Sequence, residues 1–187
     1  MTVEHNYIAL EGPIGVGKTS LARRLADTFG AELMLEAADQ NPFLENFYND
    51  PRYGALPAQL FFLFQRAQQL REFRQSNLFS PVCVADFLFE KDRLFAELTL
   101  NPDELGLYEQ VLKSLAVEAP VPDLVVYLQA PVDVLIERIA RRGIGYEQSM
   151  GPEYLQRLAE TYTRFFHNYN DSPLLIVNAG YIDWVHN

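Results

Sequence analysis

Near the start of the chain, the stretch GPIGVGKT carries residues whose types and spacing suit the binding of a polyphosphate. Gly12, Gly17, Lys18 and Thr19 fall at the spacing G-x-x-x-x-G-K-T. Glycines let backbone N–H groups converge on phosphate oxygens, the lysine reaches the β- and γ-phosphates, and the threonine hydroxyl is a ligand for Mg²⁺. An apolar run before the motif and a helical pattern after it favour a phosphate loop over a glycine-rich turn without a ligand. The motif leaves open whether water, a protein, a nucleotide or a small alcohol receives the phosphoryl group.

Two carboxylates follow apolar runs further along the chain. Glu36 ends the run ELML, and Asp86 ends the run VCVA. If both runs are parallel strands, both carboxylates face the edge of the sheet that holds the phosphate loop. Asp86 then suits a Mg²⁺ ligand, with a helix cap as the alternative. Glu36 suits a general base for an attacking hydroxyl, with a solvated loop residue as the alternative. Asp123 precedes its apolar run and is therefore predicted to be a loop or cap residue at the opposite edge.

Two stretches with a helical pattern contain polar or charged side chains that could line a binding site. Gln59 and Arg66 are seven residues apart in LPAQLFFLFQRAQQLREF, a pattern typical of a core or dimer helix, and their common face predicts that both line a pocket. Arg138, Arg141 and Arg142 precede a glycine in LIERIARRGIGYEQ. Guanidinium groups on a mobile segment can close over a nucleotide and meet the charge on a transferred phosphoryl group. Cations also stabilise a helix C-terminus, and both roles can hold at once.

The elements that must position these residues alternate along the chain. Short apolar runs predict strands at 7–10, 32–35, 82–85, 124–128 and 174–177. The last three are almost continuously apolar, which predicts parallel strands buried on both faces. Helical patterns cover 19–29, 42–49, 56–73, 103–117, 132–142 and 153–168. This alternation predicts an α/β fold with a doubly wound five-stranded parallel sheet and helices on both faces. Because no linker or repeat interrupts it, residues 1–187 are predicted to form a single domain.

Composition narrows the class of protein. The net charge of −10 repels a nucleic-acid backbone, so no nucleic-acid partner is predicted. Cys83 is the single cysteine and lies in an apolar run, which predicts a buried, reduced thiol. No signal peptide and no apolar run long enough to cross a bilayer is recognised, and the three histidines lack metal-ligand spacing. These features predict a cytoplasmic protein without a membrane partner.

Together the motifs resemble the deoxynucleoside kinase family, whose members phosphorylate the 5′-hydroxyl of deoxynucleosides. The resemblance runs from about Tyr7 to Val177 through EGPIGVGKTS, the Glu after the second strand, AQLFFLFQR, KDRLF and YEQSMGPEYL, in the same order. It implies a P-loop kinase fold with an Arg-containing lid, with ATP and Mg²⁺ as cofactors. The residues that the resemblance assigns to the nucleotide are Gly12, Gly15, Gly17, Lys18, Thr19, Ser20, Arg138 and Arg142, and those assigned to the metal are Thr19 and Asp86.

The same resemblance implies the acceptor site. Glu36 corresponds to the general base, which would act beside Lys18 and Arg142 as the catalytic groups. Tyr48 and Glu147 correspond to residues that hold the sugar 3′-hydroxyl. The residues that correspond to the base-binding set are Gln59, Arg66 and Asp92. In the family, the Arg–Asp combination tends to accompany purine or cytosine bases, which implies a purine deoxynucleoside or deoxycytidine as substrate.

Two departures from the family pattern and two alternatives accompany this hypothesis. Phe87 stands where the family usually has an Arg after the strand-end acid, and Ile144 occupies a common Arg position of the lid. One alternative is a nucleoside monophosphate kinase of the thymidylate kinase kind, which needs extra basic residues in its acceptor pocket. Arg66 is found there, but no cluster of arginines is recognised beside Glu36, whose negative charge would repel a monophosphate. The other is a non-catalytic nucleotide-binding protein. Relatives are commonly dimers, so a homodimer is expected.

Overall fold

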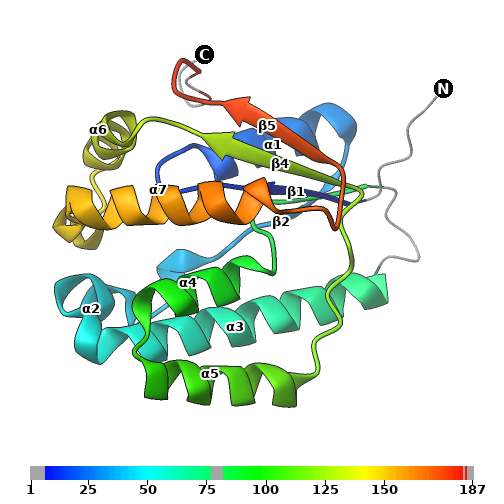
Figure 1. Cartoon of the computed structure of the whole chain (residues 1–187). Helices are drawn as coiled ribbons and strands as arrows, with labels where there is room; N and C mark the ends of the chain where they lie inside the picture. Colours follow the sequence, from blue (N-terminus) through cyan, green and yellow to red (C-terminus); the bar gives the residue numbers. More distant parts are fainter. Residues whose placement is uncertain (1–6, 77–81, 183, 185–187) are drawn as a thin grey trace.

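The centre of the molecule is a five-stranded parallel sheet. The computed structural model describes residues 7–76, 82–182 and 184. Its strands are β1 (Tyr7–Glu11), β2 (Glu32–Met34), β3 (Cys83–Ala85), β4 (Leu124–Gln129) and β5 (Leu174–Asn178). They lie in the order β2-β3-β1-β4-β5, so β1 and its phosphate loop occupy the middle of the sheet (Figure 1). This arrangement confirms the predicted fold class.

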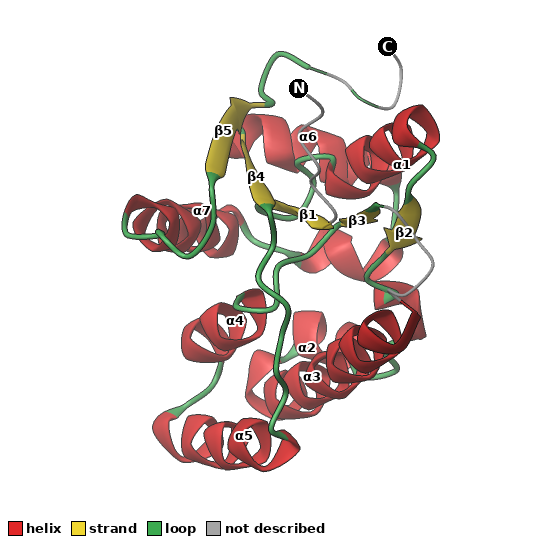
Figure 2. Cartoon of the chain, turned by 90° about the vertical axis from the view of Figure 1, so that its right-hand side faces the viewer, coloured by secondary structure: helices red, strands yellow, loops and turns green. Residues whose placement is uncertain are grey.

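Helices cover both faces of the sheet (Figure 2). Their bounds are α1 (Lys18–Phe29), α2 (Leu44–Asn49), α3 (Pro51–Ser76), α4 (Lys91–Thr99), α5 (Pro102–Leu115), α6 (Val132–Arg142) and α7 (Pro152–His167). Helices α1 and α6 lie on one face, whereas α3, α4 and α7 lie on the other. The alternation of β1 explains this, because Ile8 and Leu10 join the core beneath α1 and α6, while Tyr7 and Ala9 join the core beneath α7. Both faces of the central strand are thus buried.

Sequence signals account for several helix ends. Asn101 caps α5 by accepting from the backbone N–H groups of Asp103 and Glu104, both at 3.0 Å, and the Glu104 carboxylate accepts from the Asn101 N–H in return. Pro102 and Pro152 occupy the first positions of α5 and α7, where a missing N–H costs nothing. These features determine where α5 and α7 begin.

Two expectations about the elements need correction. β5 is not buried on both faces, because it forms an edge of the sheet and leaves Leu175 and Ile176 50% and 53% exposed. An apolar run cannot reveal whether a second strand pairs with each of its sides. Helix α3 is longer than the predicted 56–73, and α4 was not predicted.

The amino-terminal edge of the sheet carries no part of the phosphate loop. Asp123 lies there, and its Oδ2 accepts a hydrogen bond of 2.9 Å from the Tyr7 N–H. Asp123 is therefore a loop residue at the edge of the sheet opposite the phosphate loop, as predicted. Among the residues that the structure describes, no helix is both long and apolar enough to cross a bilayer.

Candidate active site

The loop between β1 and α1 has the geometry of an anion-binding cradle. Gly12 and Gly17 adopt φ angles of 153° and 101°, which side chains with a Cβ rarely tolerate. A Cβ on Gly12 would also lie 2.4 Å from the carbonyl oxygen of Leu128. The Lys18 ammonium group folds over the loop and donates to the Gly12 carbonyl at 2.6 Å and to the Pro13 carbonyl at 3.3 Å. Because α1 begins at Lys18, the positive end of its dipole faces the same space.

A buried carboxylate that the sequence analysis missed braces this loop. Glu11 is the last residue of β1, and its Oε1 accepts from the Gly12 N–H at 2.8 Å and from the Tyr162 hydroxyl at 2.9 Å. Its Oε2 accepts from the Leu88 N–H at 2.9 Å. Glu11 therefore ties the start of the phosphate loop to the segment after β3 and to α7. The signal available in the sequence was an acid at the end of an apolar strand.

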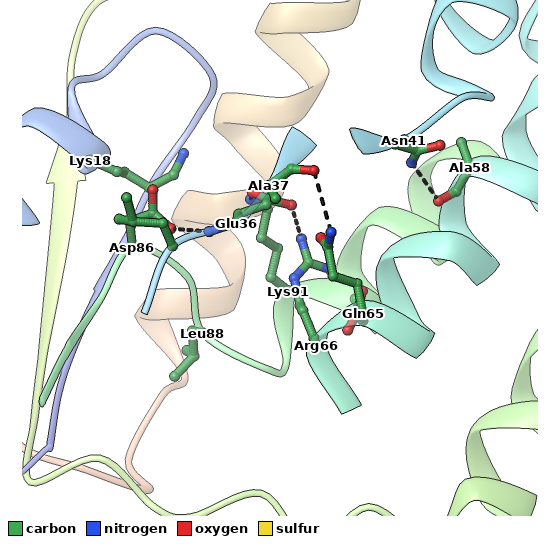
Figure 3. Close-up of polar contacts among 12 residues, drawn as sticks. Lys18, Glu36, Ala37, Asn41, Ala58, Gln65, Arg66, Asp86, Leu88 and Lys91 are labelled. Atoms are coloured by element: carbon green, nitrogen blue, oxygen red, sulfur yellow. Dashed lines mark hydrogen bonds and ion pairs between the residues drawn. The ribbon is translucent and has the colours of Figure 1, made fainter. Parts of the chain in front are cut away.

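Asp86 connects the phosphate loop to Glu36. The Thr19 hydroxyl donates to Asp86 Oδ2 at 2.5 Å. The Glu36 backbone N–H donates to Asp86 Oδ1 at 2.7 Å (Figure 3). The carboxyl ends of β2 and β3 meet here, as predicted from their parallel pairing. A hydroxyl and a carboxylate oxygen, both hard donors beside a phosphate cradle, fit the ligand preference of Mg²⁺.

The Glu36 carboxylate is held by two buried cations. Its Oε1 accepts from Arg66 on α3, and its Oε2 accepts from Lys91 on α4 at 2.8 Å. Arg66 also donates to Asp92. Burial alone would raise the pKa of the Glu36 carboxyl, but Arg66 and Lys91 outweigh burial and lower it to about 2. Glu36 is therefore ionised at neutral pH.

The cations at Glu36 bear on the monophosphate kinase alternative. The arginine beside Glu36 is Arg66, as the sequence analysis expected, and Lys91 is a second cation there that it did not identify. The lysine was overlooked because a charged residue in the stretch FEKDR resembles a solvated surface residue. The two cations face two anions, Glu36 and Asp92, so the cluster has no excess positive charge to attract a phosphate-bearing acceptor.

One cavity of about 450 Å³ joins the phosphate loop to the Glu36 cluster. The residues of the site that line it are Gly15, Gly17, Lys18, Thr19, Ser20, Glu36, Tyr48, Gln59, Arg66, Asp86, Lys91, Arg138, Arg142 and Glu147. Of the predicted site residues, Gly12 and Asp92 do not line it. Gly12 lies at the base of the loop under the Lys18 ammonium group, and Asp92 lies behind Arg66. The structure therefore brings the predicted residues together.

The acceptor end of the cavity has polar atoms on an apolar wall. Tyr48 packs its ring parallel to that of Tyr146, with centroids 5.8 Å apart, near the buried Glu147. Gln59 and Arg66 both line the cavity, as their common helical face predicted. Arg66 Nε is buried without a hydrogen-bond partner among the described residues, and Arg66 lines the cavity. Such an atom favours a polar ligand at this end.

The arginines at the end of α6 serve different contacts. Arg142 donates through Nε and NH2 to Glu147 Oε2, at 3.0 and 2.6 Å. Arg138 instead donates to the carbonyls of Val16, Ala179 and Ile182, at 3.3, 2.8 and 2.8 Å. Arg138 thus links the phosphate loop to the segment after β5 as well as lining the cavity. Their roles toward a nucleotide and the motion of this segment as a lid stay predictions.

Trp184 is a cavity residue that the sequence analysis did not identify. A Cβ on Gly17 would lie 2.6 Å from Trp184 Cδ1, so the indole lies directly against the phosphate loop. Its Nε1 is buried without a hydrogen-bond partner among the described residues. The only sequence signal is that Trp184 is the single tryptophan. Its place depends on the path of the chain after β5, which no local pattern predicts.

Comparisons with known proteins agree with this geometry. The sequence model described as deoxynucleoside kinase matches residues 8–187. The chain is 35% identical to a deoxyguanosine kinase of Bacillus subtilis over 158 residues, which cover 83% of this chain and 76% of the relative. It is 31% identical to a deoxyadenosine kinase of Lactobacillus acidophilus over 194 residues, which cover 96% of this chain and 88% of the relative.

A solved structure of a deoxyadenosine kinase has the same fold as this chain. The deoxyadenosine kinase of M. mycoides with bound dATP superposes with a TM-score of 0.82 at 25% identity, covering 94% of this chain and 91% of that one. Likeness on this scale extends over almost the whole of both chains. The chain therefore belongs to the deoxynucleoside kinase family, the enzymes that phosphorylate deoxynucleosides with ATP in nucleoside salvage.

Proposed function

We propose that this enzyme uses Mg²⁺ with ATP and transfers the γ-phosphoryl group to the 5′-hydroxyl of a purine deoxynucleoside or deoxycytidine. The observation that carries the proposal is the connection from Thr19 through Asp86 to Glu36, at 2.5 and 2.7 Å, within one cavity. It joins a phosphate cradle to an ionised carboxylate that suits an acceptor hydroxyl. Transfer of this kind depends mainly on positioning and charge neutralisation.

At the donor end, the loop glycines and Ser20 supply backbone N–H groups, and Lys18 supplies positive charge. Burial, followed by the nearby charge of Lys91, lowers the pKa of Lys18 to about 8, so most of its ammonium form persists at neutral pH. Thr19 and Asp86 would hold Mg²⁺, which when bound neutralises charge on the phosphates. Arg138 and Arg142 are assigned to the donor phosphates on the lid side.

At the acceptor end, Glu36 takes the proton of the 5′-hydroxyl as that oxygen bonds to phosphorus. Tyr48 and Glu147 are assigned to the sugar 3′-hydroxyl. Gln59 offers a donor and an acceptor to the edge of the base, and the Arg66–Asp92 pair closes the far end. A buried pair of this kind is costly unless its remaining groups find partners, which supports a role in choosing the base.

A phosphorylation panel tests the proposal. ATP with Mg²⁺ is offered to the four deoxynucleosides, to their 5′-monophosphates and to no acceptor, and labelled products are separated. Product from deoxyadenosine, deoxyguanosine or deoxycytidine in excess of product from thymidine is the expected result. Turnover of monophosphates alone would indicate a nucleoside monophosphate kinase. Turnover mainly of thymidine would contradict the proposed preference for a purine or cytosine base.

The remaining proposals concern the state of the protein. Residues 1–187 act as one domain in the cytoplasm, where ATP is abundant and Cys83 stays reduced, without a nucleic-acid or membrane partner. Helices α3 and α5 pack on each other and leave Phe64 and Leu107 half-exposed, which supports a homodimer through that surface. Light scattering should give twice the chain mass of 21.4 kDa, and a monomeric mass would contradict the dimer.

A further inference from the structure

Lys91, the first residue of α4, brings a buried ammonium group into the cavity. Its side chain is 7% exposed, and Nζ lies 2.8 Å from Glu36 Oε2 and 5.3 Å from the centre of the Phe95 ring. Two costs oppose a lysine at this place. Burial removes its charge from water, and the first turn of a helix repels cations. The contact with Glu36 must offset both costs, so the position of Lys91 is explained by the site and not by the helix.

Lys91 and Arg66 fix both oxygens of the Glu36 carboxylate from different helices. Arg66 on α3 donates to Glu36 and to Asp92 through different nitrogens. Lys91 on α4 donates to the other Glu36 oxygen, and Figure 3 shows Arg66 and Lys91 beside Glu36. Two anions therefore face two cations. Loss of Lys91 would leave Glu36 with only a shared cation and one oxygen without its donor.

Lys91 is also the cation that the segment after β3 contributes to the cavity. Within residues 82–92 it is the single Lys or Arg. Phe87, which directly follows Asp86, is fully buried beneath the Arg66 guanidinium, 5.5 Å from ring centre to Cζ, and does not line the cavity. Lys91 lines the same cavity as Lys18 and Thr19, so its charge lies in the space that the phosphate loop borders.

We propose that Lys91 is a positioning residue for phosphoryl transfer, which holds the Glu36 carboxylate toward the acceptor hydroxyl and adds fixed positive charge beside the phosphate loop. This inference rests on the function proposed above. In the transfer, the acceptor oxygen bonds to the γ-phosphorus, the bond from that phosphorus to the bridging oxygen of ADP breaks, and the proton passes to Glu36. Lys91 exchanges no proton and stays an ammonium group throughout.

The test compares K91M, K91Q and K91R with K113M, the same apolar replacement at an exposed lysine of α5. K91M and K91Q should lower kcat by about 10- to 100-fold, as the loss of one preorganised charge does elsewhere, with both KM values within about threefold of wild type. K91R should recover most of the loss, and K113M should match wild type. Thermal unfolding and ATP binding establish that each variant is folded.

A second measurement separates positioning from charge balance. Asp92→Asn restores the balance of charge in the K91M background, and the D92N single variant serves as its reference. Positioning predicts that K91M lowers kcat by the same factor in the wild-type and D92N backgrounds. Pure charge balance predicts that the K91M/D92N double variant recovers the wild-type kcat, because its cluster is neutral again, and that result would overturn the proposal.

Failure of the proposal is distinguishable from failure of the proposed function. Wild-type enzyme without deoxynucleoside-dependent ATP turnover would remove the function and the role of Lys91 with it. Active wild-type enzyme with K91M and K91Q at full kcat, or with a loss confined to KM, would leave the function in place and overturn the role of Lys91 alone.

Discussion

The Thr19 hydroxyl lies 2.5 Å from Asp86 Oδ2, so two residues 67 positions apart in the chain share one hydrogen bond at the mouth of the phosphate loop. The pair predicts the behaviour of D86N. Asn is nearly the same size and keeps one oxygen, so Glu36 N–H can retain its acceptor while the anionic metal ligand is lost. The Mg²⁺ concentration for half-maximal rate should rise about 10- to 100-fold.

Initial rates at fixed ATP over a series of Mg²⁺ concentrations measure this shift. Asp123→Asn is the matched control, since Asp123 lies at the opposite edge of the sheet and bonds the Tyr7 N–H. Its Mg²⁺ requirement should equal that of wild type. An unchanged requirement in D86N would remove Asp86 from the metal site.

The second prediction concerns Glu36→Gln. The carboxylate is expected to take the acceptor proton, and an amide cannot, so kcat should fall about 100-fold or more while deoxynucleoside affinity changes little. Steady-state kinetics and calorimetric binding measure the two quantities. Glu153→Gln, at an exposed position of α7, should change neither. Full kcat in E36Q would show that another group, or none, accepts the proton.

Much of the fold follows from the sequence because its signals are local. The apolar strands, the G-x-x-x-x-G-K-T spacing and the Asn101–Pro102 start of α5 each involve a few adjacent residues, and the structure contains all of them. The exposed face of β5 is different. Whether a strand lies inside a sheet or at its edge depends on which other strands pair with it, which is a property of the whole topology.

The residues of the candidate site also fall into those that the sequence predicted and those that it did not. Lys18, Thr19 and Asp86 were predictable because a strand end or a loop motif determines where each side chain lies. Lys91 and Trp184 were not, because their importance arises from contacts with Glu36 and Gly17, far away in the sequence. A lone lysine or tryptophan carries no information about its partner until the chain is folded.

Cys83 yields a prediction about reactivity. The thiol lies in β3, and burial, followed by the charge of Glu32, raises its pKa to about 12. At pH 8 the thiolate fraction is then about 1 in 10,000, and the thiolate is the reactive form. Native protein should release almost no chromophore from a disulfide reagent over an hour, whereas unfolded protein should release one equivalent. Rapid reaction of the native protein would contradict the burial of β3.

Replacement of Arg142, which donates to Glu147, should affect the activity of the enzyme much more than its stability. The Arg142 side chain is 44% exposed, so R142A should lower the melting temperature only modestly, by the loss of its hydrogen bonds to Glu147. It should lower kcat by about tenfold or more if Arg142 contributes its guanidinium group to the transferred phosphoryl, as proposed. Arg164→Ala, at an exposed position of α7, is the control and should keep full activity. Equal activity of the two variants would exclude Arg142 from the transfer.

Trp184 makes nucleotide binding visible without a label. The indole lies against Gly17 in the phosphate loop and is the single tryptophan, so its fluorescence reports on that place alone. Titration with ATP should change the emission with a saturating curve, whereas deoxyadenosine alone should change it much less, because the acceptor end lies beyond Asp86 and Glu36. Lys18→Met should abolish the response to ATP while leaving the emission of the free protein similar. A response to the deoxynucleoside and none to ATP would mean that the two ends of the cavity have been assigned in the wrong order.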